Sequence, residues 1–251
     1  MTIKIYKTVV EQIQALADHV IMIAQNVITT YGEFNIALAG GNSPKKLYEL
    51  LATDEYQKKI DWSKVNFFFG DERYVPAADT QRNSWMVQKY LFEHLNISSS
   101  QIFKVDTSLP PAQAAKKYDE TITTHFKQLP VRFDLMLLGL GDNSHTASLF
   151  PFTSVVSEKS PTVKAIFIKE QNSYRITMTA PLINQSQHIA FLVYGKEKAE
   201  AVYHVLKDVR NAEKYPAQLI NPNAGELQWF LDNDAALLLN IDPLNVNRKT
   251  L

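Results

Sequence analysis

The sequence predicts an α/β protein built on an open, mostly parallel sheet with helices on both faces. Two observations support this prediction. Short, nearly continuous apolar runs recur along the chain, as in FNIALAG, VNFFFG and FDLMLLGLG, and such runs are typical of strands buried on both faces. Most of them are followed by segments whose apolar residues recur at steps of three and four, which indicates amphipathic helices. Alternating strands and helices characterise a parallel sheet covered on both sides.

The first half of the chain contains three of these apolar runs. Strands are predicted over residues 34–40, 65–70 and 133–141. Helical spacing is present over residues 9–30, 43–51, 83–95 and 111–126. For the second of these helices, Ser43 is the expected N-cap and Pro44 the first helical residue, because serine caps free backbone N–H groups and proline needs no donor there.

The second half is richer in strands. Apolar runs predict strands near residues 163–168, 174–179, 189–194 and 235–240, and a helix over 196–208. Part of 150–185 could form a small antiparallel addition to the main sheet. Because no linker, repeat or low-complexity segment interrupts the chain, we expect a single domain over residues 1–251.

Composition excludes several classes of function. The 251 residues contain 26 basic and 26 acidic side chains, so no global positive field favours nucleic acid or an anionic membrane. There is no cysteine, which excludes disulfides, thiol catalysis and cysteine-ligated metals. No zinc-binding signature is present, and no apolar run approaches the roughly 18–20 residues of a membrane span. With no signal peptide evident, we expect a cytoplasmic protein that acts on a small molecule, as a monomer or a homodimer.

The loops that follow strands are the expected place for a ligand in such a sheet. The first is AGGNSPKKL (39–47). Gly40 and Gly41 allow close backbone approach, Asn42 and Ser43 offer side-chain hydrogen bonds, and the following helix directs its N-terminus toward the loop. This pattern predicts an anion site, although an ordinary glycine turn before a helix would also explain it.

The second loop is GDERYVP (70–76), where three charged residues directly follow a hydrophobic strand. Alternation along an extended chain would place Asp71 and Arg73 on one side and Glu72 on the other. An arginine held by a carboxylate can bind an anion or stabilise developing negative charge. A solvated strand end with a local ion pair is the alternative interpretation.

The third loop, GLGDNSHTASLFP (139–151), follows the most apolar strand. His145 is the only one of the six histidines predicted to lie in a glycine-containing loop at the carboxyl end of a strand. Imidazole is the side chain best suited to proton transfer near neutral pH. Further along the chain, Arg175 and Lys198 are separated cations that could close around a phosphate together with the first loop.

Taken together, these segments resemble the 6-phosphogluconolactonase family, within the wider glucosamine-6-phosphate isomerase/deaminase-like superfamily. The similarity is carried in order by GGNSPKKLY (40–48), GDERYVP, RNSWM (82–86), GLGDNSHTASLFP, RITMTAPLIN (175–184), FLVYGKEKA (191–199) and PAQLINP (216–222). It spans nearly the whole chain. It implies an open α/β fold, no metal or organic cofactor, and hydrolysis of 6-phosphoglucono-δ-lactone to 6-phosphogluconate.

The resemblance also assigns roles to the candidate residues. His145 would be the general base, Arg73 held by Asp71 would stabilise the oxyanion, and the phosphate would bind residues 40–43 with Arg175 and Lys198. The family's usual Asp-Gly before the histidine is Asn143-Ser144 here. Asn143 can orient the imidazole but carries no charge, and Asp142 is a candidate replacement for that charge.

Two rival functions stay open at this point. The first is a sugar-phosphate isomerase or deaminase. Those enzymes resemble M-DEY where this chain has GDER, and they carry a glutamate where this chain has Phe150, so Arg73 and Phe150 oppose this alternative. The second is a non-catalytic sugar-phosphate binding protein, which the Asn143-Ser144 departure keeps open.

Overall fold

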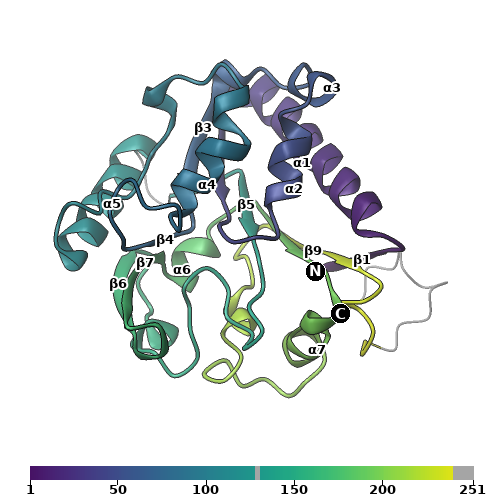
Figure 1. Cartoon of the computed structure of the whole chain (residues 1–251), viewed down its shortest axis with the longest axis vertical. Helices are drawn as coiled ribbons and strands as arrows, with labels where there is room; N and C mark the ends of the chain where they lie inside the picture. Colours follow the sequence, from purple (N-terminus) through teal and green to yellow (C-terminus); the bar gives the residue numbers. More distant parts are fainter. Residues whose placement is uncertain (128–130, 240–251) are drawn as a thin grey trace.

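A computed structural model describes residues 1–127 and 131–239, which form two sheets (Figure 1). The larger sheet has six parallel strands in the order β1-β9-β8-β5-β2-β3. The smaller sheet is antiparallel, in the order β4-β7-β6. The strands are β1 (Thr2–Tyr6), β2 (Phe34–Leu38), β3 (Val65–Phe69), β4 (Asp71–Arg73), β5 (Leu135–Leu138), β6 (Val163–Ile168), β7 (Ser173–Met178), β8 (His188–Val193) and β9 (Glu226–Asp232). This confirms the predicted α/β class, and β6 and β7 form most of the antiparallel addition expected within 150–185.

Helices cover both faces of the parallel sheet. The α-helices are α1 (Val9–Tyr31), α2 (Lys45–Leu51), α3 (Asp54–Gln57), α4 (Asn83–Tyr90), α5 (Pro111–Phe126), α6 (Ala180–Ile183) and α7 (Ala199–Leu206). Short 3₁₀ helices are η1 (Trp62–Lys64), η2 (Phe92–His94), η3 (Ser99–Gln101), η4 (Ser154–Ser157), η5 (Lys169–Gln171), η6 (Lys196–Lys198) and η7 (Pro216–Leu219). In Figure 1, α1, α2 and α4 lie together on one side, while α5, α6 and α7 lie across the sheet.

The strand pleat divides the core into two hydrophobic clusters. On β5, Met136 and Leu138 pack into the cluster that contains α5, α6 and α7, whereas Leu135 and Leu137 pack into the one that contains α1, α2 and α4. All four side chains are at most 2% exposed. Because successive strand residues face opposite sides, a strand covered on both faces must be apolar throughout. This explains why β5 is the most apolar segment of the sequence.

Three local predictions were wrong. A strand is predicted over 235–240, but residues 233–239 form turns and a bend, and residue 240 lies outside the described part. The last strand among the described residues is β9. The apolar run reflects Ala235 and Leu239, which pack against the core from turns. Helix α2 begins at Lys45, so Pro44 takes the N-cap position that was predicted for Ser43, without a side-chain cap among the described residues. The helix predicted over 83–95 ends at Tyr90 and continues as η2.

Candidate active site

A cavity of about 520 Å³ lies at the carboxyl ends of four neighbouring strands. Its walls are the loops that follow β2, β3, β5 and β8, with side chains from β4 and β7. Nine of the ten residues predicted for the site line it: Gly40, Gly41, Asn42, Ser43, Asp71, Arg73, His145, Arg175 and Lys198. The tenth, Asn143, contacts His145. Four loops far apart in the sequence therefore meet at one edge of the sheet, as the strand order requires.

Asn143 fixes the orientation and tautomer of the His145 ring. Its Oδ1 lies 2.5 Å from His145 Nδ1 and also accepts a hydrogen bond from the His145 backbone N–H at 3.3 Å. An amide oxygen can only accept, so Nδ1 must carry the proton of the neutral ring. Nε2 is then left with its lone pair available, which is the state a general base requires.

The Phe150 ring stacks on the imidazole, with ring centroids 4.1 Å apart and planes inclined by 17°. Burial lowers the pKa of His145 to about 4. The nearby charges act in both directions on this pKa: Asp71 and Asp142 raise it, while Lys198 and Arg175 lower it. His145 is consequently neutral at physiological pH. In the sequence, Phe150 is notable only for replacing a glutamate, and nothing there indicates that it packs on the histidine.

The backbone beside His145 is tightly constrained. The ring lies so close to Gly141 that a Cβ at that position would overlap its Nδ1 and Cε1 atoms. Ser144 adopts the left-handed conformation with φ 61°, which costs a non-glycine residue roughly 1–2 kcal/mol. Its side chain is buried, and its carbonyl accepts a hydrogen bond from the Ala217 N–H at 3.0 Å. This bond ties the loop to η7 and holds Ser144 in a conformation that glycine would adopt without strain.

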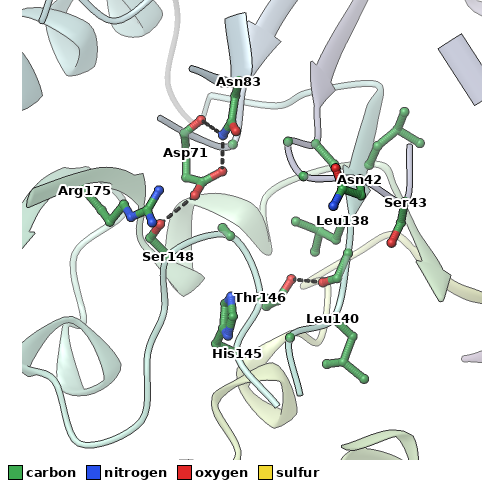
Figure 2. Close-up of a pocket in the computed structure, with 18 of the residues that line it drawn as sticks. Asn42, Ser43, Asp71, Asn83, Leu138, Leu140, His145, Thr146, Ser148 and Arg175 are labelled. Atoms are coloured by element: carbon green, nitrogen blue, oxygen red, sulfur yellow. Dashed lines mark hydrogen bonds between the residues drawn. The ribbon is translucent and has the colours of Figure 1, made fainter. Parts of the chain in front are cut away.

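The second loop differs from expectation in its pairing. Glu72 is fully buried while Asp71 and Arg73 reach the cavity, which confirms the predicted alternation. However, Asp71 and Arg73 make no ion pair with each other within the described residues. The Arg73 guanidinium instead donates to the Gln81 carbonyl at 2.6 Å. Asp71 accepts hydrogen bonds from Asn83 and Ser148 (Figure 2). The idea that Asp71 holds Arg73 is therefore wrong, because β4 directs the carboxylate toward α4 and the loop after β5.

Two guanidinium groups lie on neighbouring strands of the small sheet. Arg73 of β4 and Arg175 of β7 are direct partners in the antiparallel ladder. Burial, together with the charge of Arg73, lowers the pKa of Arg175. The Arg175 guanidinium donates to the Gln171 side chain, which also lines the cavity. Two like charges held side by side in a partly buried site favour an anionic ligand.

Lys198 and the glycine loop complete the cavity. Lys198 Nζ lies 2.5 Å from Asp142 Oδ1. Asp142 therefore pairs with Lys198, and its charge also raises the pKa of His145, although as the smallest of the nearby charge effects. On the glycine loop, Gly41 has φ 86° and the Ser43 carbonyl accepts a hydrogen bond from the Tyr194 hydroxyl at 3.2 Å. This bond links the loop after β2 to the loop after β8.

Several lining residues have no assigned role in the sequence analysis: Asn83, Ser148, Phe150, Gln171, Tyr194 and Glu197. Asn83, Ser148 and Phe150 lie inside the motifs RNSWM and HTASLFP, but only the folded chain brings them into the cavity. Over residues 1–127 and 131–239, no group of three or more histidine and carboxylate side chains could hold a metal ion. In the same residues, no helix has both the length and the apolar character needed to cross a membrane.

The open parallel sheet, with a histidine, a glycine loop and three cationic side chains around one cavity, places the protein among α/β enzymes that act on small anionic substrates. Comparison with known proteins is consistent with this class. Residues 7–229 match the family described as glucosamine-6-phosphate isomerases/6-phosphogluconolactonase. The chain therefore belongs to this family.

Individual relatives narrow the assignment within the family. The chain is 35% identical to a 6-phosphogluconolactonase of Nostoc over 91% of this chain and 98% of the relative. It is 38% identical to a Synechocystis 6-phosphogluconolactonase over 83% and 85% of the two chains. The crystal structure of 6-phosphogluconolactonase from Thermotoga maritima superimposes with a TM-score of 0.80 at 28% identity, covering 92% and 99%. These relatives place the chain among the 6-phosphogluconolactonase enzymes.

Proposed function

We propose that the protein hydrolyses 6-phosphoglucono-δ-lactone to 6-phosphogluconate, with His145 as the general base. The observation that carries this proposal is the state of His145: neutral, fixed in one tautomer by Asn143, and facing the same cavity as the cationic side chains. The substrate is inferred from the relatives, which are named 6-phosphogluconolactonase. The arrangement of His145 and the cationic side chains supports hydrolysis by general-base catalysis.

Binding begins with the phosphate group, which is remote from the reacting bond. The loop at residues 40–43 offers backbone N–H groups and the side chains of Asn42 and Ser43, while Arg175 and Lys198 supply positive charge. Lys198 shares its ammonium group between the phosphate and Asp142. Binding energy from this group fixes the lactone carbonyl near His145 and lowers the entropy cost of the reaction.

His145 then activates water. Nε2 accepts a proton from the water as its oxygen bonds to the lactone carbonyl carbon, forming a tetrahedral intermediate with a negative oxygen. Arg73 is the cation that stabilises this oxyanion. The bond from the carbonyl carbon to the ring oxygen then breaks, and protonated Nε2 returns its proton to the departing oxygen. The product is the open-chain acid, which ionises, and His145 is again neutral.

The decisive experiment follows lactone hydrolysis at slightly acidic pH, where spontaneous ring opening is slow. The lactone is generated in place from glucose 6-phosphate, and wild type is compared with His145→Ala. Wild type should accelerate hydrolysis, and the variant should lose roughly 10²–10⁴-fold in kcat, the usual contribution of a general base. Near-normal turnover by the variant would remove His145 from the base role.

Binding of 6-phosphogluconate tests the phosphate site separately. Arg175→Gln and Lys198→Gln should each weaken product binding and raise KM more than they lower kcat, because they contact a group that does not react. If both variants bind the product normally, the phosphate assignment is wrong. Release of ammonia from glucosamine 6-phosphate would instead indicate a deaminase, and product binding without any turnover would indicate a binding protein.

A further inference from the structure

The Asp71 carboxylate is held in the cavity by two side chains from opposite sides (Figure 2). Asn83 Nδ2 donates to Asp71 Oδ1 and to the Asp71 carbonyl, both at 2.9 Å. Ser148 Oγ donates to the other carboxylate oxygen, Oδ2, at 2.5 Å. Asn83 and Ser148 are each only 1% exposed. Each oxygen of the carboxylate therefore has its own buried donor, one from the start of α4 and one from the loop after β5.

Asn83 is itself anchored by a buried ion pair. The fully buried Glu72 accepts the backbone N–H groups of Asn83 at 2.6 Å and of Ser84 at 3.0 Å. Its carboxylate lies 3.6 Å from the Arg82 guanidinium, which is also buried. Glu72 thus fastens the first turn of α4 to β4. Asp71 is the neighbour of Glu72 on β4. The Asn83 amide and the Asp71 carboxylate to which it donates are therefore both fixed to the same short strand.

Asn83 also contacts the glycine loop. Its side-chain amide lies so close to Gly40 that a Cβ there would overlap it. Its Oδ1 is buried and has no hydrogen-bond partner within the described residues. The amide group therefore fills the space between Asp71 and the loop after β2. A change in this side chain would alter the spacing between Asp71 on β4 and the loop after β2.

We propose that Asn83 and Ser148 are positioning residues that hold the Asp71 carboxylate as a fixed negative charge in the cavity that it shares with His145, with Asn83 also setting the distance from Asp71 to the glycine loop. This inference rests on the proposed function, in which His145 becomes a cation during the reaction. Asn143, hydrogen-bonded to the ring, is neutral. A fixed anion elsewhere in the cavity is then the charge that stabilises the imidazolium.

The charges around His145 single out Asp71 for this role. Arg175 from β7 and Lys198 from η6 both disfavour the protonated ring. Asp142 favours it, but Asp142 is exposed and paired with Lys198. Asp71 has the largest effect of any charge on the His145 pKa, and it raises that pKa. Its two hydrogen bonds keep the charge in place while the ring gains and loses its proton.

The first test uses coupling between substitutions. Ser148→Ala should lower kcat roughly tenfold or more, with KM changed by less than about twofold, because a misplaced catalytic charge costs rate rather than binding. Asn83→Ala should lower kcat to a similar extent and also raise KM, because the glycine loop loses its neighbour. In an Asp71→Ala background, Ser148→Ala should cause no further loss beyond about twofold, since Ser148 acts only through Asp71.

The controls are residues of the same types whose hydrogen bonds lie outside the cavity. Asn66 donates to the Asn35 side chain at 3.2 Å, and Ser157 donates to the Ser154 carbonyl at 3.0 Å. Asn66→Ala and Ser157→Ala should leave kcat unchanged. Thermal unfolding of every variant separates misfolding from misplacement. If Asn83→Ala does not fold, Asn83→Asp keeps the side-chain shape and places a second carboxylate against Asp71, with the same expected loss of kcat.

A second readout does not need turnover. The His145 ring protons, followed by NMR as pH is lowered, should titrate at lower pH in Asp71→Ala than in wild type. An unchanged titration would overturn the role of Asp71, and additive losses of kcat for Ser148→Ala and Asp71→Ala would overturn the positioning role. If wild type failed to hydrolyse the lactone, the proposed function would fall, while the titration would still report on the Asp71 charge.

Discussion

At the scale of single residues, three neighbours decide what His145 can do, each through a different physical effect. Asn143 sets the tautomer by accepting a hydrogen bond from Nδ1, and Phe150 stacks on the ring. Gly141 has no side chain, so the ring can occupy the space that a Cβ would fill. Burial in this setting keeps the ring neutral. A neutral imidazole with a free Nε2 is ready to accept a proton, although its low pKa makes it a weaker base than a solvated histidine.

The identity of residue 143 should control the pH dependence of the reaction. In wild type, kcat/KM should hold as pH falls until it approaches the His145 pKa of about 4. Asn143→Asp places a carboxylate against Nδ1, which favours the imidazolium and should raise this pKa by roughly one to three units. The acidic limb of the kcat/KM profile should therefore move to higher pH by a similar amount.

A profile of kcat/KM against pH for both proteins measures this shift. Asp142→Asn is the matched control, because it removes a carboxylate that also raises the His145 pKa but is paired with Lys198. It should move the limb only slightly, and toward lower pH. A limb that stays in place in Asn143→Asp would show that His145 is not the group whose titration limits the rate.

The close approach of Gly141 to the His145 ring predicts a second residue-scale effect. Gly141→Ala should displace the imidazole and lower kcat by roughly 10²-fold, the cost of misplacing a catalytic group by about 1 Å. Gly139→Ala in the same loop is the control, because a Cβ there meets nothing within 4 Å. Steady-state kinetics should show a much smaller loss for Gly139→Ala. Equal losses in both variants would attribute the effect to the loop backbone rather than to the ring.

At the scale of elements, the junction of β4 and α4 depends on one buried carboxylate. Glu72 accepts backbone N–H groups at the start of α4 and lies beside the buried Arg82 guanidinium. Glu72→Gln should lower the free energy of unfolding by roughly 3 kcal/mol or more, because it leaves a buried cation without its partner. Urea denaturation measures the change.

The matched control is Glu55→Gln, which breaks an ion pair between exposed side chains of Glu55 and Lys59. Exposed pairs contribute little, so this variant should lie within about 0.5 kcal/mol of wild type. A comparably small change for Glu72→Gln would mean that water or another group compensates Arg82, and the anchoring of Asn83 described above would lose its basis.

The errors in predicting elements share one cause, which is that local pattern does not report pairing. The segment ELQWFLD contains Glu226 and Gln228, so it attracts less notice than AALLL, yet it forms β9 between β1 and β8. Strand β1 is only half-buried along its length, and strand β4 has three residues. Both are strands because a neighbouring strand offers free backbone groups. By contrast, α1, β3 and β5 carry strong periodic or continuous patterns, and their predictions are confirmed within a few residues.

At the scale of the whole molecule, a separate titrating group lies near the amino ends of the strands, away from the cavity at their carboxyl ends. His19 of α1 is 8% exposed, packs against Phe230 and lies near His188 at the start of β8. Burial, with smaller contributions from the charges of Lys4 and His188, lowers its pKa from 6.5 to about 4, and Glu226 opposes this shift. The unfolded chain therefore binds a proton on His19 at a higher pH than the folded chain does.

The sign of the stability change follows from this difference. The contribution of neutral His19 to stability is present above pH 6.5 and is lost as pH falls from 6.5 toward 4. Wild type should lose about 2 kcal/mol more than a His19→Gln variant between pH 7 and pH 5. Urea denaturation at the two pH values measures the difference, with substitution of the exposed His94 by glutamine as a control that should follow wild type. Equal losses in wild type and His19→Gln would contradict the assignment.

The sequence by itself determined the α/β class, most of the strands and helices, the loops that form the site and nine of the residues that line the cavity. It could do so because buried strands must be apolar and because parallel strands place their carboxyl ends at one edge of the sheet. Only the tertiary structure decided the pairings: Asp71 with Asn83 and Ser148, Asp142 with Lys198, and Phe150 with His145. Those pairings depend on directions and distances of a few ångströms between segments far apart in the chain, which a residue pattern does not contain.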